Sequence, residues 1–408
     1  MTKMTMTSSP YGGVDPGLAR SLAGRTAQQQ PRWPDEQEVR EVREALGGRA
    51  PLVAPAEVDQ LTARLAEVAA GRALLLQGGD CAETFAGNTP EHLRANLRVL
   101  LHCATLLEVA SALPVVHVGR IAGQYAKPRS RALGPDGLPA YRGDIVHGAA
   151  ADAAARRPDP RRMLTAYAGA QAALTVVRAT AAESRTELFT GHEALLLDYE
   201  LPLVRAGYGL SGHFLWIGER TRDLDGAHVT LARHLANPVG VKVGPGTTPA
   251  QVLALAAALD PDRTPGRLTL ISRMGADRVT GVLPPLVEAV AAAGHPVVWL
   301  CDPMHGNTQV AESGLKTRHF DRIVAEVEGY FAVHRALGSH PGGLHLEFTG
   351  DDVTECLGGR EDLREDQLPE RYLTACDPRL NGRQSLDLTR LVAEILLRRP
   401  VRGDAVRV

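Results

Sequence analysis

The stretch LLLQGGDCAETF, residues 74–85, runs from three leucines into two glycines and then places an acid, a cysteine and a second acid close together. A short apolar run bounded by glycine is typical of a buried strand. We predict the first strand at residues 73–80. Seven more runs of this type follow along the chain, at residues 114–120, 187–194, 214–219, 239–245, 268–275, 296–303 and 343–350.

Longer amphipathic stretches, such as PAQVLALAAAL and LPPLVEAVAAAG, separate these runs. Eight near-continuous apolar strands that alternate with helices predict an α/β fold, a closed (β/α)8 TIM barrel whose strands are covered on both faces. An open doubly wound sheet would normally carry a glycine-rich phosphate loop after its first strand, and QGGDCAE does not match that fingerprint.

Two segments precede the barrel. Residues 1–30 are rich in Thr, Ser, Gly and Gln and are expected to form a flexible lead-in. Residues 31–72 hold two helical patterns, DEQEVREVREAL and PAEVDQLTARLAEVAA, which predict an N-terminal helical extension. We expect these helices to cover the closed end of the barrel or to meet a partner subunit. Residues 73–400 then form the catalytic barrel.

Composition excludes several classes of partner. The 408 residues carry a net charge of -2, so neither nucleic acid nor an anionic membrane is an expected partner. No leader pattern and no window of about 18 uncharged apolar residues is present, which predicts a cytoplasmic protein. Five cysteines, spread over a long chain, are expected to be free thiols rather than a disulfide framework.

Positively charged side chains end or follow four of the predicted strands: Arg120, Arg220, Lys242 and Arg273. In isolation each would be interpreted as an ordinary solvated or salt-bridged residue. Reactive groups of a (β/α)8 barrel project from the carboxyl ends of its strands, so these cations would converge on one mouth. Such convergence is costly unless anions meet the cations, and guanidinium groups bind phosphate and carboxylate in bidentate fashion. We therefore predict a phosphorylated, carboxylated small-molecule substrate.

A second set of strand-end residues combines a thiol, an imidazole and two carboxylates: Cys81, His305, Glu347 and Asp377. Separately, Cys81 is equally well a small core residue and His305 a hydrogen-bonded one. Together they suit a divalent transition ion such as Mn²⁺, Co²⁺, Fe²⁺ or Zn²⁺ better than Mg²⁺. The absence of a CxxC pair favours a catalytic site over a structural zinc site. The glycines before Cys81 are interpreted as backbone that leaves room for metal and substrate.

Several longer motifs resemble those of one known family, the type II 3-deoxy-D-arabino-heptulosonate-7-phosphate (DAHP) synthases, over residues 32–396. They are QGGDCAETF, VGRIAGQYAKPRS, WIGERTRDLDGAH, NPVGVKVGP, LISRMG, CDPMHGNT, GLKTRHFDRIVAEV, GLHLEFTGDDVTECLGG and ACDPRLN. The resemblance implies a metal-dependent barrel, with Mn²⁺ or Co²⁺ foremost. It also implies condensation of phosphoenolpyruvate with erythrose 4-phosphate, the first step of the shikimate pathway.

The resemblance also implies roles for individual residues. The metal ligands would be Cys81, His305, Glu347 and Asp377, and the phosphoenolpyruvate site would use Arg120, Glu219, Arg220, Lys242 and Arg273. Lys127, Arg129 and Ser130 would form the erythrose 4-phosphate side. Arg120, Lys242 and Glu219 are the expected catalytic residues. Glu219 would orient or deprotonate the attacking water, with Asp302 or a metal-bound hydroxide as alternatives.

Other residues near these motifs have ordinary interpretations. His117 is expected to be a hydrogen-bonded interior residue, and Asp302 to shape the turn that aims His305. Cys103 and Cys301 are expected in the core. Cys376 differs, because its neighbour Asp377 is a predicted ligand. We expect Cys376 to lie near enough to Cys81 for oxidation to pair the two thiols when no metal is bound.

Longer family members carry a helical insertion between the second and third strands that binds aromatic amino acids, whereas residues 164–194 pass almost directly from helix to strand. We therefore expect a short form, similar to phenazine-pathway members, that serves a specialised pathway and is not inhibited by aromatic amino acids. An amino-DAHP synthase that uses an imino sugar phosphate is one alternative, and a non-catalytic barrel scaffold is another. A homodimer is expected on general grounds.

Overall fold

The computed structural model describes residues 15–134 and 137–398, and its centre is a closed barrel of eight parallel strands. The strands are β1 (Leu74–Gly79), β2 (Val115–Arg120), β3 (Leu188–Glu193), β6 (Phe214–Ile217), β7 (Val239–Val243), β8 (Leu268–Ser272), β9 (Val298–Cys301) and β12 (Gly343–Glu347). Their order around the barrel is β1-β12-β9-β8-β7-β6-β3-β2. Each of the eight predicted strands is present, so the expected (β/α)8 fold is confirmed.

The register that closes the barrel brings three predicted site segments together. Gly79 at the end of β1 pairs with Glu347 of β12 on one side and with Arg120 of β2 on the other. Because parallel strands share one carboxyl end, the residues that follow them meet at one mouth. The two residues thus lie beside the segment that leads into Cys81.

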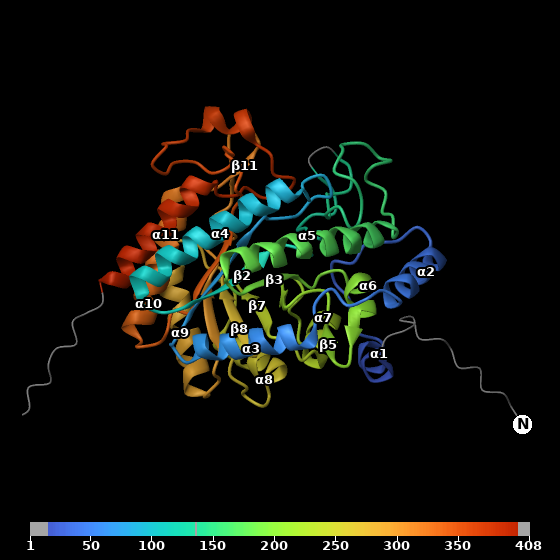
Figure 1. The fold of residues 1–408 in the computed structure, drawn as a ribbon, viewed down its shortest axis with the longest axis horizontal. Helices are drawn as coiled ribbons and strands as arrows, with labels where there is room; N and C mark the ends of the chain where they lie inside the picture. The colour runs from blue at the N-terminus through green and yellow to red at the C-terminus, as the bar shows by residue number, and fades with distance from the viewer. Residues whose placement is uncertain (1–14, 135–136, 399–408) are drawn as a thin grey trace, which may run out of the picture.

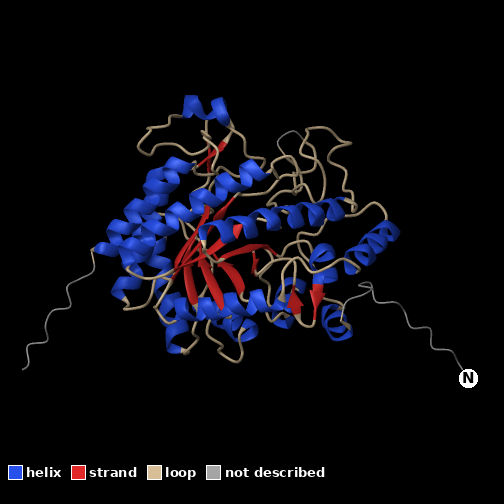
Figure 2. Cartoon of the chain, in the orientation of Figure 1, coloured by secondary structure: helices blue, strands red, loops and turns tan. Residues whose placement is uncertain are grey.

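A ring of helices surrounds the strands, as Figures 1 and 2 show. It consists of α4 (Pro90–Ser111), α5 (Arg162–Ser184), α7 (Ala227–His234), α8 (Pro249–Leu259), α9 (Val279–Ala292), α10 (Phe320–Ala336) and α11 (Gly382–Leu397). Alternate residues of β1 serve two cores: Leu75 packs inside the barrel, whereas Leu74 and Leu76 pack against the helical layer. This pleat explains why the strands are continuously apolar in sequence.

Short elements extend the connections at the barrel ends. After β3, α6 (Leu197–Glu200) and the 3-10 turn η1 (Leu201–Leu203) lead into a hairpin of β4 (Val204–Arg205) and β5 (Tyr208–Gly209). After β9, a second hairpin joins β10 (Gln309–Val310) to β11 (Lys316–Thr317), and η2 (Glu365–Arg371) lies between β12 and α11. In the described chain, α5 is the helix that connects β2 to β3. It ends at Ser184 and β3 begins at Leu188, so no further helix is inserted between them.

The N-terminal helices pack against the barrel, which was one of the two arrangements expected from the sequence. α3 (Pro55–Ala69) places Leu61, Leu65 and Val68 in the same buried cluster as the interior residues Leu75 and Ile271, so it closes the amino-terminal end. α2 (Glu36–Gly47) packs beside α5 and α6. Figure 1 shows α3 running beneath the strands.

The described part of the expected flexible lead-in contains a helix. α1 (Pro16–Leu22) is capped by the side chain of Asp15, and its Leu18 and Leu22 pack against Leu231 of α7. Polar, glycine-containing composition suggested flexibility, but two buried leucines anchor this segment. Residues 1–14 lie outside the described residues.

The two glycines of QGGD, Gly78 and Gly79, are required by the structure for a different reason from the one expected. A side chain at Gly78 would lie 2.1 Å from the ring of Phe348, so the space beside this glycine is filled by an aromatic ring and not by a ligand. Gly79 has a φ of 146°, which favours glycine. Among the described residues no helix is long and apolar enough to cross a membrane.

Candidate active site

A cavity of about 840 Å³ opens at the carboxyl ends of the strands. Most of the predicted site residues line it: Arg120, Lys127, Arg129, Ser130, Glu219, Arg220, Lys242, Arg273, His305 and Asp377. Cys81 and Glu347 lie fully buried beneath its floor. The structure therefore brings together, at one mouth, residues that the sequence separates by almost 300 positions.

Glu347 is the buried carboxylate at the base of the site. Its Oε1 accepts hydrogen bonds from Arg120 Nη2 at 3.0 Å and lies 3.1 Å from His305 Nε2, while Oε2 accepts from Arg318 Nη2 at 2.9 Å. Burial alone would raise the pKa of Glu347, but the charges of His305, Lys127 and Arg318 hold it well below its usual range. Glu347 is therefore an ionised acceptor inside the protein.

The four predicted metal ligands lie in two pairs. His305 contacts Glu347, and Cys81 Sγ lies 3.8 Å from Asp377 Oδ2. The Lys127 ammonium lies between the pairs, 3.5 Å from Glu347 Oε1 and 3.7 Å from Asp377 Oδ2. In this arrangement, no group of three or more His, Cys, Asp and Glu side chains among the described residues is placed to hold a metal ion.

The donor chemistry at this place nevertheless fits a divalent ion. Two carboxylates face one cation, and the pKa of Asp377 is held below its usual range because Lys127 and Lys316 outweigh the effect of burial. Burial, followed by a hydrogen bond with Cys376, raises the pKa of Cys81 well above the usual thiol value, so Cys81 is a neutral thiol here. A thiol that ionises on binding, an imidazole and two carboxylates suit a borderline divalent metal.

Asp302 orients His305, as its ordinary interpretation predicted. Its Oδ1 accepts hydrogen bonds from the backbone N–H groups of Met304 and His305 at 3.1 and 3.2 Å. Its Oδ2 contacts His305 Nδ1 at 2.7 Å and accepts from Lys242 Nζ at 2.5 Å. Because Asp302 holds Nδ1, the imidazole presents Nε2 to the base of the site. At Lys242, burial outweighs the attraction of the Asp302 carboxylate and lowers the pKa of the ammonium group to about 8.

Protein carboxylates neutralise part of the predicted cation cluster, which reduces the charge that a substrate anion has to balance. Arg120 bonds Glu347 and the carbonyl oxygens of Asp80 and Cys81, and its guanidinium lies 5.1 Å from the ring of Trp216. Lys242 is paired with Asp302.

Two of the predicted cations keep capacity for an anion. Arg273 donates from Nη2 to the carbonyl oxygen of His305 at 2.7 Å, and its buried Nε has no partner among the described residues. Arg220 lies at the outer rim, where Nη2 donates to Ser130 Oγ at 2.5 Å. Arg129 lines the same part of the cavity, whereas Lys127 lies deeper than the other two residues of its predicted group.

Glu193 is the main site residue that the sequence reasoning missed. It ends β3, lines the cavity, and its Oε1 is buried with no hydrogen-bond partner in the described chain. Burial raises its pKa, although Lys127, Lys242 and His305 act in the opposite sense. The signal was available, because Glu193 closes the third predicted strand just as Arg120 closes the second. Trp216 and Lys316 also line the cavity and had no strand-end signal.

The remaining residues singled out in the sequence have the expected surroundings. His117 is buried within β2 and does not line the cavity. Cys103 and Cys301 are fully buried in the main core. Cys376 shares a buried cluster with Cys81, so the predicted proximity is confirmed. All five cysteines are free.

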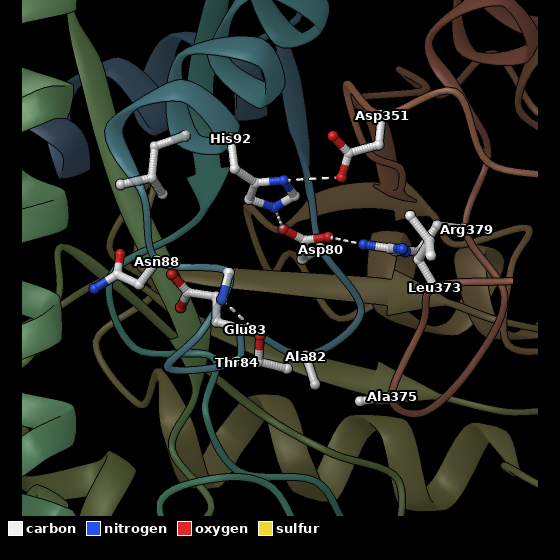
Figure 3. Close-up of a pocket in the computed structure, with 12 residues that line it drawn as sticks. Asp80, Ala82, Glu83, Thr84, Asn88, His92, Asp351, Leu373, Ala375 and Arg379 are labelled. Atoms are coloured by element: carbon white, nitrogen blue, oxygen red, sulfur yellow. Dashed lines mark hydrogen bonds and ion pairs between the residues drawn. The ribbon is translucent and has the colours of Figure 1, made fainter. Parts of the chain in front are cut away.

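Behind the loops that carry Cys81 and Asp377, a smaller cavity of about 190 Å³ is lined by a chain of ion pairs (Figure 3). His92 of α4 contacts Asp80 Oδ2 at 2.7 Å through Nε2 and Asp351 Oδ2 at 2.9 Å through Nδ1. Arg379 contacts Asp80 Oδ1 at 2.5 Å and Glu355 at 2.7 Å. This chain ties the loop of Cys81 to the loop of Asp377, because Asp80 and Arg379 are their near neighbours in sequence.

Comparison with known proteins agrees with the class of protein that the fold and the site indicate. The described fold and its cationic mouth define a (β/α)8 barrel enzyme with a site for anions. The sequence profile of the class-II DAHP synthetase family matches residues 18–188 and 180–393. This chain belongs to that family, and the expectation of a DAHP synthase is confirmed.

Two curated relatives are similar over nearly their whole length. Phospho-2-dehydro-3-deoxyheptonate aldolase of Mycolicibacterium smegmatis is 48% identical, with 92% of this chain and 94% of the relative covered. The enzyme of the same name from Streptomyces coelicolor is 48% identical, with 94% and 98% covered. A solved phospho-2-dehydro-3-deoxyheptonate aldolase from Francisella tularensis has a TM-score of 0.55 at 14% identity, covers 88% of this chain and 97% of its own, and supports the fold alone.

The charge of His92 provides a pH-dependent test of the ion-pair chain. Hydrogen bonds to Asp351 and Asp80 raise the pKa of His92 to about 10. Its stabilising effect is therefore complete below the unfolded-state pKa of about 6.5 and is lost as the pH rises to about 10. Because Asp351 is 35% exposed, we expect His92→Gln to lower the free energy of unfolding by about 1–3 kcal/mol at pH 6 and by much less at pH 10.

Urea unfolding at the two pH values measures this difference. His102→Gln, on the exposed side of the same helix, is the matched control and should leave the free energy of unfolding unchanged at both. A deficit in His92→Gln that grows with pH would contradict the assignment.

Proposed function

We propose that this enzyme condenses phosphoenolpyruvate with erythrose 4-phosphate and water, giving DAHP and inorganic phosphate, with the help of a bound divalent metal ion. The observation that carries the proposal is that one cavity holds a cluster of cations together with His305 and Asp377, and that Cys81 and Glu347 lie directly beneath, in contact with these two residues. Class-II DAHP synthases generally depend on a divalent metal. The ions that this mixed donor set favours are Mn²⁺ and Co²⁺, followed by Zn²⁺ and Fe²⁺.

Phosphoenolpyruvate would bind at the inner part of the cavity. Arg273 has a free buried Nε–H, and Lys242 and Arg120 flank the same space. A planar guanidinium can hold the carboxylate or phosphate in bidentate fashion, and a second cation neutralises the remaining charge. The low dielectric of the buried wall strengthens both contacts.

Erythrose 4-phosphate would place its phosphate at the outer rim. Arg129, Ser130 and Arg220 are close together there, and Arg220 already donates to the Ser130 hydroxyl. The aldehyde would then point inward, toward the predicted ligand group. A bound metal supplies Lewis-acid polarisation of a carbonyl oxygen. Lys127, between Glu347 and Asp377, would be displaced from its present carboxylate contacts.

The bond changes balance with one water molecule. C3 of phosphoenolpyruvate forms a bond to the aldehyde carbon, and the aldehyde oxygen takes up a proton. Water adds at C2 and loses one proton. The C2–O bond to phosphate then breaks, the new hydroxyl becomes the C2 carbonyl, and its proton leaves with inorganic phosphate. A carboxylate near C2 would accept the proton of that water.

Two carboxylates are candidates for this proton transfer. Glu219, the residue expected from the resemblance, accepts a hydrogen bond from Arg222 at 2.8 Å, which leaves Oε2 without a partner in the described structure. Glu193 has an unpartnered Oε1, and burial raises its pKa, which makes it a stronger base than a solvent-exposed carboxylate. We therefore assign the water-activating role to Glu193 and a supporting role beside Arg222 to Glu219.

Activity and metal binding together test the proposal. Purified enzyme with Mn²⁺ or Co²⁺ should consume phosphoenolpyruvate only when erythrose 4-phosphate is present, and a chelator should stop the reaction. Cys81→Ala should lose turnover and the thiolate-to-Co²⁺ charge-transfer absorption seen on titration, while keeping its circular dichroism spectrum. Cys103→Ala, in the core away from the cavity, controls for loss of a thiol. Turnover with an imino sugar phosphate but not with the aldehyde would favour an amino-DAHP synthase.

A glutamine substitution separates the two candidate bases. Glu193→Gln should lower kcat by about 100-fold or more, because a general base contributes about 10²–10⁴-fold, while the KM for both substrates changes little. Glu219→Gln, measured in parallel, should lower kcat less. The opposite order of the two variants would transfer the role to Glu219.

Regulation follows from the short connection between α5 and β3. The insertion that binds aromatic amino acids in longer members has no counterpart between Ser184 and Leu188. We infer that phenylalanine, tyrosine and tryptophan do not inhibit this enzyme, as suits supply of a specialised aromatic pathway. Initial rates measured with about 1 mM of each amino acid should match the rates without it. This concentration is on the order of the upper end of the usual range of enzyme KM values. Strong inhibition by any one would contradict this.

A further inference from the structure

An N-terminal segment, residues 24–30, contacts two loops that contribute residues to the large cavity. At the loop after β6, the carbonyl oxygen of Thr26 accepts a hydrogen bond from the Ala227 N–H at 3.0 Å. Arg25 also pairs with Asp225 at 2.8 Å, although Asp225 is 91% exposed, so this ion pair contributes little. The loop that the segment contacts begins just after β6 and carries Glu219 and Arg220.

The same segment contacts the loop after β2 through one glutamine. Gln29 Oε1 accepts a hydrogen bond from the backbone N–H of Arg129 at 2.8 Å, and its carbonyl oxygen accepts one from Arg142 Nη1 at 3.1 Å. Gln29 has a φ of 63°, an uncommon backbone conformation for a residue other than glycine. Such outliers persist where the surroundings impose them and often lie at functional loops.

A third contact anchors the segment to the barrel. Gln30 Nε2 donates to the carbonyl oxygen of Leu195 at 2.8 Å, and Gln30 Oε1 accepts from the N–H of Leu197 at 3.0 Å. These residues follow β3 and begin α6. Gln29 is therefore held between an anchored neighbour and the loop of Arg129, whereas the preceding Gln28 is exposed.

The two loops that residues 24–30 bridge meet at the rim. Arg220, from the loop after β6, donates to the hydroxyl of Ser130, from the loop after β2, and both line the cavity with Arg129. Arg129 and Ser130 are neighbours in the 127–130 turn, so a shift of this turn would move both. The Arg129 N–H, bonded to Gln29, attaches the backbone of the turn to residues 24–30. Positioning of a few charged groups within about 0.5 Å decides how well they bind an anion.

We infer that Gln29 is a positioning residue for the phosphate of the sugar phosphate substrate: it holds the 127–130 turn so that Arg129 and Ser130 face Arg220 across the rim. This inference rests on the proposed placement of erythrose 4-phosphate at the same three residues. It assigns to residues 24–30, expected from composition to be a flexible lead-in, a part in substrate binding that is separate from covering the barrel end.

Steady-state kinetics with both substrates tests the inference. Gln29→Ala should raise the KM for erythrose 4-phosphate by about three- to tenfold, the size expected for one lost hydrogen bond to a positioned loop, with the KM for phosphoenolpyruvate and kcat within twofold of wild type. Gln28→Ala, the exposed neighbour, is the matched control and should change none of these values. Gln29→Asn keeps an amide but shortens its reach, so it should give the same split.

The outcomes separate the inference from the substrate placement. Arg129→Ala and Ser130→Ala, measured in parallel, should also raise the KM for erythrose 4-phosphate selectively. If they do and neither Gln29 variant does, the positioning role is overturned while the site stands. If none of the four raises it, the placement of the sugar phosphate fails. Equal increases in both KM values for the Gln29 variants, or a lower thermal midpoint without a selective KM change, would indicate a merely structural residue and overturn the inference.

Discussion

The buried carboxylate of Glu347 is the interaction on which the site depends. It is fully buried, and positively charged or protonated groups from β2, from the loops after β2 and β9 and from the segment after β11 surround it: Arg120, Lys127, His305 and Arg318. A buried charge without partners is strongly destabilising, and removal of one partner of such a pair costs about 3–5 kcal/mol. The elements that deliver these partners are therefore held to the carboxyl end of the barrel, where β12 pairs with β1.

The same requirement shapes the rest of the cavity. Cations gathered for anionic substrates repel one another until an anion is bound, and protein carboxylates reduce that cost. Lys242 is paired with Asp302, and Lys127 lies between Glu347 and Asp377. Arg273 keeps a buried Nε donor that has no partner in the described chain, and Arg220 lies at the rim beside Ser130. The paired cations are held at the floor of the cavity by protein carboxylates, and the less saturated ones keep hydrogen-bonding capacity for an anion.

Much of the fold and part of the site could be predicted because strand ends in a barrel share one mouth. Cys81, Arg120, Lys242 and Arg273 were found by asking which side chain closes each apolar run, and all lie at or beneath the cavity. Glu193 satisfied the same rule, and applying the rule to the third strand would have found it. Gly78 was misinterpreted because no sequence pattern shows that the ring of Phe348, 270 positions away, fills its space. The packing of α1 was likewise not predicted, because its two buried leucines lie in a segment of mostly polar composition.

By itself, the sequence determined the class of fold and the kinds of chemical group at the site, since both depend on local periodicity and on which residue follows each strand. Only the tertiary structure decided which charges are paired, which are free and which backbone segments hold them. Lys127 between two carboxylates, Lys242 beside Asp302, and Gln29 on the Arg129 loop are contacts between segments that are distant in sequence. Electrostatic pairing depends on distances of a few ångströms and on burial, and neither is encoded in the spacing of residues along the chain.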